Sequence, residues 1–263
     1  MSEEVVKCTI ADHIASLSIN RPEKRNAING EVIDAMLKIL DEVAWNQEVR
    51  VIAIGGEGTG FSSGIDVTYI AGLGGVDENQ RGVYLRELAR KIQSLMNRIE
   101  SIEKPVVAVI HKYALGLAME MALACDFRIA SEETVMGLPE VHMGLVPDCG
   151  GTTRLTRALG VPKAKELVML GDNIDMATAA SLGLVTLVAP MDQLRDAAAD
   201  FMKKLMARPA RVLGLAKRLV DLSASVDEMT SFEIETLAQT GAIAAPDFPQ
   251  ILATGVQSLL KKK

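Results

Sequence analysis

The sequence predicts an α/β fold, followed by a C-terminal region that is helical throughout. Short apolar runs closed by glycine, such as residues 51–54 before Gly55, are typical of buried strands in a sheet covered on both faces. Segments with apolar residues at helical spacing, such as residues 30–44, lie between these runs. After about Met191 only helical spacing remains. Alternation of strands and helices predicts an α/β core.

The elements can be placed in order. A β-hairpin is predicted at residues 5–10 and 14–19, with a turn at Ala11, Asp12 and His13. Further strands are predicted at residues 51–54, 105–110, 127–130, 135–136 and 185–188. Helices are predicted between them at residues 30–44, 81–102, 116–124, 152–159 and 164–170. Four more helices are predicted at residues 194–206, 210–222, 226–239 and 248–260. We therefore expect a core over residues 1–190 and a helical region over residues 191–263.

Composition excludes several classes of function. A net charge of −6 and a pI near 5.3 argue against a nucleic-acid-binding surface, which needs clustered Lys and Arg. The N-terminus is acidic rather than basic and apolar, and no stretch approaches about 18 apolar residues, so we expect a cytoplasmic protein without a membrane partner. The three cysteines are far apart and are expected to be reduced thiols. The scattered His13, His111 and His142 predict no metal site.

Two segments partly resemble known functional motifs but lack residues that those motifs require. The glycine-rich residues 55–64 follow a strand but lack the Gly-Lys-Ser/Thr ending of a nucleotide-binding loop and the dinucleotide spacing. Ser62 and Ser63 lie beside glycine but not in the Gly-x-Ser-x-Gly pattern of a serine hydrolase. Ordinary turn residues are the better interpretation of both serines.

Three segments, residues 61–66, 104–126 and 136–155, place glycine or a carboxylate where a strand ends, which is where α/β folds bind ligands. Gly116 is expected to begin a helix whose first amides are unpaired and could hold an anionic oxygen. An amide near Ile65 would complete an oxyanion hole. Glu120 lies one helical turn beyond Gly116 and can face the same pocket.

Two more carboxylates, Glu140 and Asp148, follow prolines in the third segment, but sequence spacing alone does not place them beside Glu120. Structural interpretations remain open for all three. Glu120 could be an exposed residue or half of an ion pair, Glu140 a loop carboxylate, and Asp148 a cap for the helix at Thr152.

The motifs NRPEKRNAI (residues 20–28), the three segments above and LVMLGDNIDMATAASLGLV (ending at Val185) resemble the enoyl-CoA hydratase/isomerase (crotonase) superfamily. The resemblance implies a crotonase/ClpP-like spiral of repeated ββα units, with a C-terminal helical region that forms trimers or pairs of trimers. It implies an acyl-CoA substrate, no cofactor beyond the coenzyme A of that substrate, and oxyanion-hole amides from Ile65 and Leu117. The residues that it implies for coenzyme A and substrate binding are Arg25, Ala27, Ser63, Asp66, Val67 and Gly116.

The resemblance also implies catalytic roles. Glu120 and Glu140 match the two glutamates with which hydratases add water to a 2-enoyl-CoA. Asp148 stands where many hydratases have glycine and where dienoyl-CoA isomerases have aspartate, so an isomerase using Glu140 and Asp148 is the alternative to a hydratase. Where typical hydratases carry three consecutive glycines before the catalytic glutamate, this chain has Gly116, Leu117, Ala118 and Met119, and side chains are expected to crowd the approach to the thioester. A non-catalytic protein that binds CoA or RNA is a third interpretation.

Overall fold

The computed structural model describes residues 4–260, with only the backbone at residues 73–74 and 258–259, and the predicted α/β fold is confirmed. The strands in these residues are β1 (Val6–Ala11), β2 (Ile14–Ile19), β3 (Val51–Gly56), β4 (Val106–Ile110), β5 (Tyr113–Leu115), β6 (Phe127–Ser131), β7 (Val135–Gly137), β8 (Ile174–Asp175) and β9 (Leu187–Ala189). They form a larger sheet in the order β1-β2-β3-β4-β6-β9 and a smaller sheet in the order β5-β7-β8.

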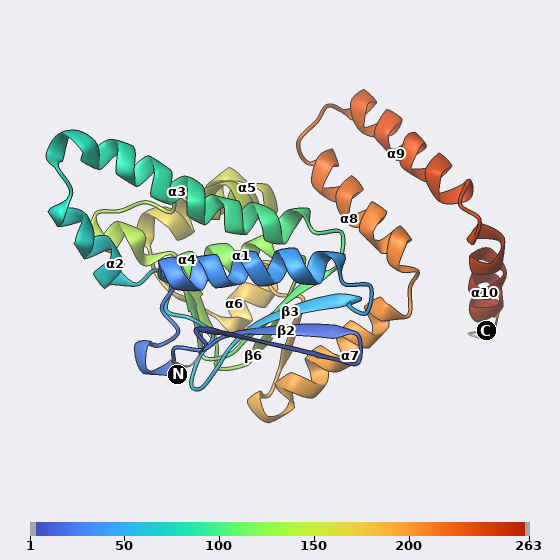
Figure 1. Cartoon of the computed structure of the whole chain (residues 1–263), viewed down its shortest axis with the longest axis horizontal. Helices are drawn as coiled ribbons and strands as arrows, with labels where there is room; N and C mark the ends of the chain where they lie inside the picture. Colours follow the sequence, from blue (N-terminus) through green and yellow to red (C-terminus); the bar gives the residue numbers. More distant parts are fainter. Residues whose placement is uncertain (1–3, 261–263) are drawn as a thin grey trace.

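The helices in the same residues are α1 (Gly30–Trp45), α2 (Val67–Ala71), α3 (Glu78–Ser101), α4 (Leu117–Ala124), α5 (Gly151–Leu170), α6 (Met176–Ser181), α7 (Leu194–Met206), α8 (Ala210–Ser223), α9 (Glu228–Ile243) and α10 (Phe248–Leu260). Figure 1 shows α1 and α3 on one side of the strands and α7 on the other.

The larger sheet begins with the predicted hairpin, in which β1 and β2 are antiparallel and Val6 pairs with Ile19. Its turn uses Asp12 and His13 with positive φ angles of 49° and 64°. From β2 to β9 the neighbouring strands are parallel. Parallel strands direct their carboxyl ends to one edge of the sheet, and the loops that follow β3 and β4 therefore begin at that edge.

Strand β3 explains how both faces of this sheet are buried. Ile52 and Ile54 belong to the main hydrophobic core together with α1 residues such as Met36 and Leu40. The alternate residues Val51 and Ala53 pack in a second cluster with residues of α7. Successive side chains of a strand point to opposite faces, so helices on both sides produce the continuous apolar run seen in the sequence.

Several predicted elements differ from those observed. The strand predicted at residues 185–188 begins two residues later, as β9. The two helices predicted at residues 152–159 and 164–170 are joined in α5 but separated by a kink at Gly160, two residues before Pro162. Strands β5 and β8 and helices α2 and α6 were not predicted, because elements of two to six residues are too short to show a periodicity.

The C-terminal helices α8, α9 and α10 extend away from the sheets (Figure 1). Helix α7 instead packs on the larger sheet through Leu194, Ala198 and Met202. Helix α8 still contacts the core, through Gly214, which is buried against Glu103, and through the ion pair of Lys217 with Asp126, so α9 and α10 are the helices that project. The domain boundary at residues 190 and 191 stays a prediction. Within the described part of the chain, no helix is both long and apolar enough to cross a membrane.

Candidate active site

The loop after β2 (residues 20–29) and the loop after β3 (residues 57–66) are joined by hydrogen bonds at the edge of the larger sheet, and are called the joined loops below. The backbone N–H of Ile28 donates to the Gly64 carbonyl at 2.8 Å, and the N–H of Asp66 donates to the Ile28 carbonyl at 2.8 Å. Asn26 is fully buried with a φ of 54°, and its amide donates to the carbonyls of Glu57 and Gly60. Asn tolerates this left-handed conformation better than most residues, which is the signal that could have identified Asn26 as a structural residue of the site.

Two backbone amides lie where the resemblance places an oxyanion hole. The turn at Gly64 packs against the start of α4, because a Cβ atom on Gly64 would collide with the Leu115 carbonyl and lie 3.2 Å from the Leu117 nitrogen. Neither the Ile65 N–H nor the Leu117 N–H has a hydrogen-bond acceptor among the described residues. Gly116, with φ 53°, is the N-cap of α4 and supplies no side-chain cap. Both amides are therefore available to an oxygen atom that carries negative charge.

Glu120 points into the protein from the first turn of α4, and only 2% of its surface is exposed. Its Oε2 accepts a hydrogen bond of 3.3 Å from the N–H of Gly151, the first residue of α5. Gly151 has to be glycine for this contact, since a Cβ atom would lie 2.9 Å from Glu120 Cγ. The interpretations of Glu120 as an exposed residue or half of an ion pair are wrong for the residues described.

Glu140 is brought to the same place by a 3₁₀ helix at Pro139–Met143 and is 8% exposed. A Cβ atom on Gly116 would lie 3.0 Å from Glu140 Oε1, so the Glu140 carboxyl group rests against the N-terminus of α4. Its Oε2 is buried and has no hydrogen-bond partner in the described part of the protein. A buried charged acceptor without a partner is costly, and a proton on this carboxyl group would lower that cost.

Asp148 is exposed and lies in the loop before α5. It does not cap that helix, because the N-cap is Gly150 and no side chain caps it. Its Oδ1 instead accepts a hydrogen bond of 3.3 Å from the thiol of Cys149. Cys149 was not among the predicted site residues, since a cysteine beside glycine carries no spacing signal.

The electrostatics show that the three carboxyl groups are neighbours. Burial, repulsion from Glu140 and repulsion from Asp148 raise the pKa of Glu120 to about 8, against the opposing hydrogen bonds from the backbone of Gly151 and Cys149. Burial also raises the pKa of Glu140, and Asp148 adds to it. Two buried carboxyl groups that repel each other tend to share one proton near neutral pH. Such a pair can donate a proton and accept one.

The residues expected to bind coenzyme A differ in how far they are exposed to solvent. Arg25 is exposed, with its guanidinium carbon 5.0 Å from the centre of the Tyr113 ring, and Val67 is exposed at the start of α2. Ala27 is buried and Ser63 partly buried, in the joined loops. The Asp66 carboxylate is already bound by other residues of the protein.

The carboxylate of Asp66 pairs with Arg21 at 3.1 Å and accepts a hydrogen bond from the N–H of Thr68 as the N-cap of α2. The hydrogen bonds from Thr68 and Arg21 lower the pKa of Asp66 against its partial burial. Arg21 also donates to the carbonyl of Ala27 at 2.6 Å, which ties both loops together.

Leu117, Ala118 and Met119, which were expected to crowd the thioester, are all buried in the main hydrophobic core. Helix α4 is surrounded by protein, with seven of its eight residues buried, and its first side chains therefore pack inward. Gly116 leaves the face toward Glu140 free of a side chain at this position.

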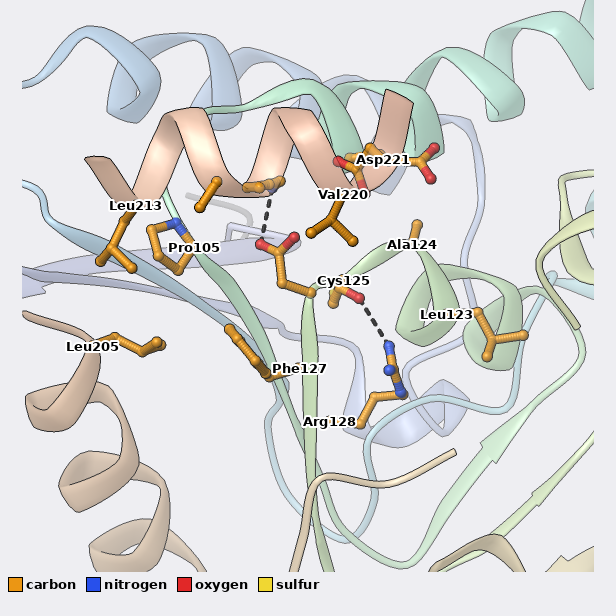
Figure 2. Close-up of a pocket in the computed structure, with 14 residues that line it drawn as sticks. Pro105, Leu123, Ala124, Cys125, Phe127, Arg128, Leu205, Leu213, Val220 and Asp221 are labelled. Atoms are coloured by element: carbon orange, nitrogen blue, oxygen red, sulfur yellow. Dashed lines mark hydrogen bonds and ion pairs between the residues drawn. The ribbon is translucent and has the colours of Figure 1, made fainter. Parts of the chain in front are cut away.

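A cavity of about 420 Å³ lies elsewhere, between α8 and the core (Figure 2). Its cations are already paired: Lys217 of α8 contacts Asp126 at 2.9 Å, and Arg128 donates to the carbonyls of Cys125, Ala122 and Leu184. The Asp221 carboxyl group also lines the cavity, and burial raises its pKa. This cavity is part of the attachment of α8 to the core. No three His, Cys, Asp or Glu side chains within the described residues are grouped to hold a metal ion.

Replacing Gly116 with alanine is expected to lower the kcat/KM of the reaction catalysed at this site at least about 100-fold. The new methyl group would displace the Glu140 carboxyl group, and the backbone would leave its positive φ. A stability loss of about 1–3 kcal/mol accompanies it. The matched control is Gly183→Ala, at φ 72° with no atom within 4 Å of its Cβ position, which should lose stability but keep activity. Steady-state kinetics and urea unfolding of both variants test this; equal activity losses would contradict it.

The two sheets, the buried neighbouring carboxyl groups and the free amides of Ile65 and Leu117 together define a protein of the crotonase fold. Solved structures with this fold include the enoyl-CoA hydratase of Bacillus anthracis, with a TM-score of 0.88 and 31% identity over 98% of this chain and 97% of that one. Another, described as a "putative enoyl-CoA hydratase" of Thermobifida fusca and solved in complex with CoA, has a TM-score of 0.82 and 29% identity over 92% of this chain and 93% of that one.

Sequence comparison identifies the family. The sequence profile of the family "Enoyl-CoA hydratase/isomerase" matches residues 9–262. A protein named "probable enoyl-CoA hydratase" of Bacillus subtilis is 36% identical over 215 residues, which cover 80% of this chain and 81% of that protein. This chain belongs to the enoyl-CoA hydratase/isomerase family, and the predicted resemblance is confirmed.

Proposed function

We propose that this protein is an enoyl-CoA hydratase, which adds the hydroxyl group and a hydrogen of water to the same face of the double bond of a 2-enoyl-CoA thioester. The observation that carries the proposal is the pair of buried carboxyl groups, Glu120 and Glu140, beside the free amides of Ile65 and Leu117. This arrangement suits a reaction that moves two protons and develops negative charge on one oxygen.

In the proposed reaction, the carboxylate of the pair takes a proton from water while the water oxygen forms a bond to C3. The electrons of the C2–C3 double bond move toward the thioester oxygen, which the Ile65 and Leu117 amides stabilise as an enolate. The protonated member of the pair then delivers its proton to C2. The pair ends with one proton, as it began, and the product is a 3-hydroxyacyl-CoA.

The CoA part of the substrate would lie over the joined loops. Arg25 offers an exposed guanidinium group for phosphate, and Val67 an apolar surface beside it. Ala27, Ser63 and Asp66 would contribute backbone atoms, since the Asp66 carboxylate is already paired. The relative from Thermobifida fusca that was solved with CoA supports this ligand class.

The direct test is to follow the ultraviolet absorbance of crotonyl-CoA and of a 3,5-dienoyl-CoA with the purified protein. Loss of absorbance with crotonyl-CoA supports the hydratase. Binding of CoA without turnover of either thioester would contradict an enzyme and favour the binding protein. RNA binding that weakens steeply with salt would do the same.

Isomerisation of a dienoyl-CoA by Glu140 and Asp148 is the second candidate. It is supported by the position of Asp148, whose charge acts on both glutamates and which does not cap α5. A carboxylate at each end of a conjugated chain could remove a proton at one carbon and return one at another.

The change Asp148→Asn separates the two reactions. It is expected to lower isomerisation at least about 100-fold, because the amide cannot carry the proton, while hydration keeps most of its rate. The two substrates measured in parallel give the ratio of rates. An unchanged ratio would remove Asp148 from the chemistry.

We also propose that α8–α10 form the interface of a homotrimer or of a pair of trimers. Large apolar side chains are exposed on these helices, including Val220, Phe232 and Leu237. Exposed apolar surface of this extent is typical of an interface.

A further inference from the structure

Cys149 lies beside the carboxyl groups of the site. Its side chain is buried, its backbone N–H acts on Glu120, and its thiol donates to Asp148 Oδ1 at 3.3 Å. Burial raises the pKa of Cys149 strongly, and Glu120 and Asp148 add to it. The thiol therefore stays protonated at neutral pH, where it is a hydrogen-bond donor and not a nucleophile.

The Cys149 thiol is the hydrogen-bond donor that holds the Asp148 carboxylate. In the described part of the chain, its carboxylate has no hydrogen-bond partner other than the thiol, and its backbone carbonyl is held by Gln93 of α3 at 2.7 Å. Asp148 also lines a polar cavity of about 260 Å³ together with Gln93, Asn97 and Arg157. Without the thiol contact, the carboxylate is free to turn into this cavity and toward water.

We propose that Cys149 is a positioning residue, which keeps the Asp148 carboxylate turned toward Glu120 and Glu140. The proposal deepens the proposed function and rests on it for its consequence in catalysis. A held negative charge at this point favours the protonated form of the neighbouring pair, so that one proton remains available to the substrate. In the isomerase alternative, the same contact places Asp148 for its proton transfer.

Charged groups from other elements also lie around Cys149. Glu120 comes from α4 and Glu140 from the 3₁₀ helix at Pro139–Met143. Arg154 of α5 donates to the Cys149 carbonyl at 3.3 Å and pairs with Glu100 of α3 at 2.7 Å. These backbone and ion-pair contacts do not involve the thiol and are retained in the variants below.

The test is the titration of Glu120, followed by carbon-13 NMR of protein labelled at the glutamate carboxyl carbons and assigned with Glu120→Gln. Asp148→Asn should lower the midpoint of Glu120 by about half a unit or more, because a like charge is removed. Cys149→Ala should lower it in the same direction, and Cys149→Ser, which keeps a donor, should restore it. Cys149→Ala should add nothing in the Asp148→Asn background.

Cys125→Ala is the matched control. Cys125 is also buried and its thiol donates to a backbone carbonyl, that of Met121, at 3.4 Å. It should lose stability without moving the titration. The proposal is overturned if Cys149→Ala leaves the midpoint unchanged, or if it lowers the midpoint equally with and without the Asp148 charge, since packing alone would do that. Turnover of crotonyl-CoA is measured separately: an inactive wild-type protein with the expected titrations contradicts the hydratase and leaves the positioning role supported.

Discussion

Replacing Glu140 with glutamine is expected to lower kcat/KM for hydration or isomerisation by about 1000-fold or more, without lowering the free energy of unfolding. The amide keeps the shape of the side chain but neither accepts nor donates a proton at the pH of the reaction. No hydrogen bond to Glu140 Oε2 is lost among the described residues. Because burial raises the pKa of Glu140, the variant should gain stability as the pH rises above the ordinary glutamate pKa. Steady-state kinetics and urea unfolding measure the two quantities.

The matched control for this change is Glu133→Gln, which alters an exposed glutamate in the turn between β6 and β7. That variant should keep full activity. Turnover of Glu140→Gln within a factor of two of the wild-type rate would exclude Glu140 from the chemistry. Loss of activity together with unfolding would show instead a structural role.

Replacing Glu120 with glutamine is expected to abolish activity and, unusually, to stabilise the protein above neutral pH. The pKa of Glu120 is raised from 4.5 to about 8, so between these values the folded protein holds a proton that the unfolded chain releases. The contribution of Glu120 to the free energy of unfolding of the wild-type protein therefore falls as the pH rises from about 4.5 to about 8. A glutamine does not titrate, and the loss disappears.

The expected gain is about 2–4 kcal/mol at pH 8.5 and below about 1 kcal/mol at pH 5. Urea unfolding of wild type and Glu120→Gln at a series of pH values gives the difference directly. A difference that is constant with pH would contradict the raised pKa. A destabilised variant at every pH would mean that the added amide lacks a hydrogen-bond partner, and the pH slope alone would then carry the test.

Much of the core could be predicted from the sequence. The hairpin, β3, β4 and the long helices have strong periodicity or long apolar runs, and these patterns come from burial on one face or on two. Gly116 and Glu120 could be related because a helix fixes the geometry of residues four positions apart. The free amide of Leu117 follows from the same reasoning about a helix N-terminus.

The meeting of Glu120, Glu140 and Asp148 could not be predicted from spacing. It depends on contacts between elements far apart in the sequence, such as Gly151 of α5 against Glu120 and Gly116 against Glu140. The role of Asp66 was also hidden, because its partner Arg21 lies 45 residues away. Glycines that make room for a neighbour look like turn residues until the neighbour is placed.

The central claim is that Glu120 and Glu140 together add water to an enoyl thioester held at the Ile65 and Leu117 amides. Incubation with crotonyl-CoA in deuterium oxide, followed by NMR of the product, tests it most directly. We expect 3-hydroxybutyryl-CoA with one deuterium at C2 in a single configuration from the wild-type protein, and no product from Glu120→Gln or Glu140→Gln. The same product at the wild-type rate from either variant, or none from the wild-type protein, would contradict the account.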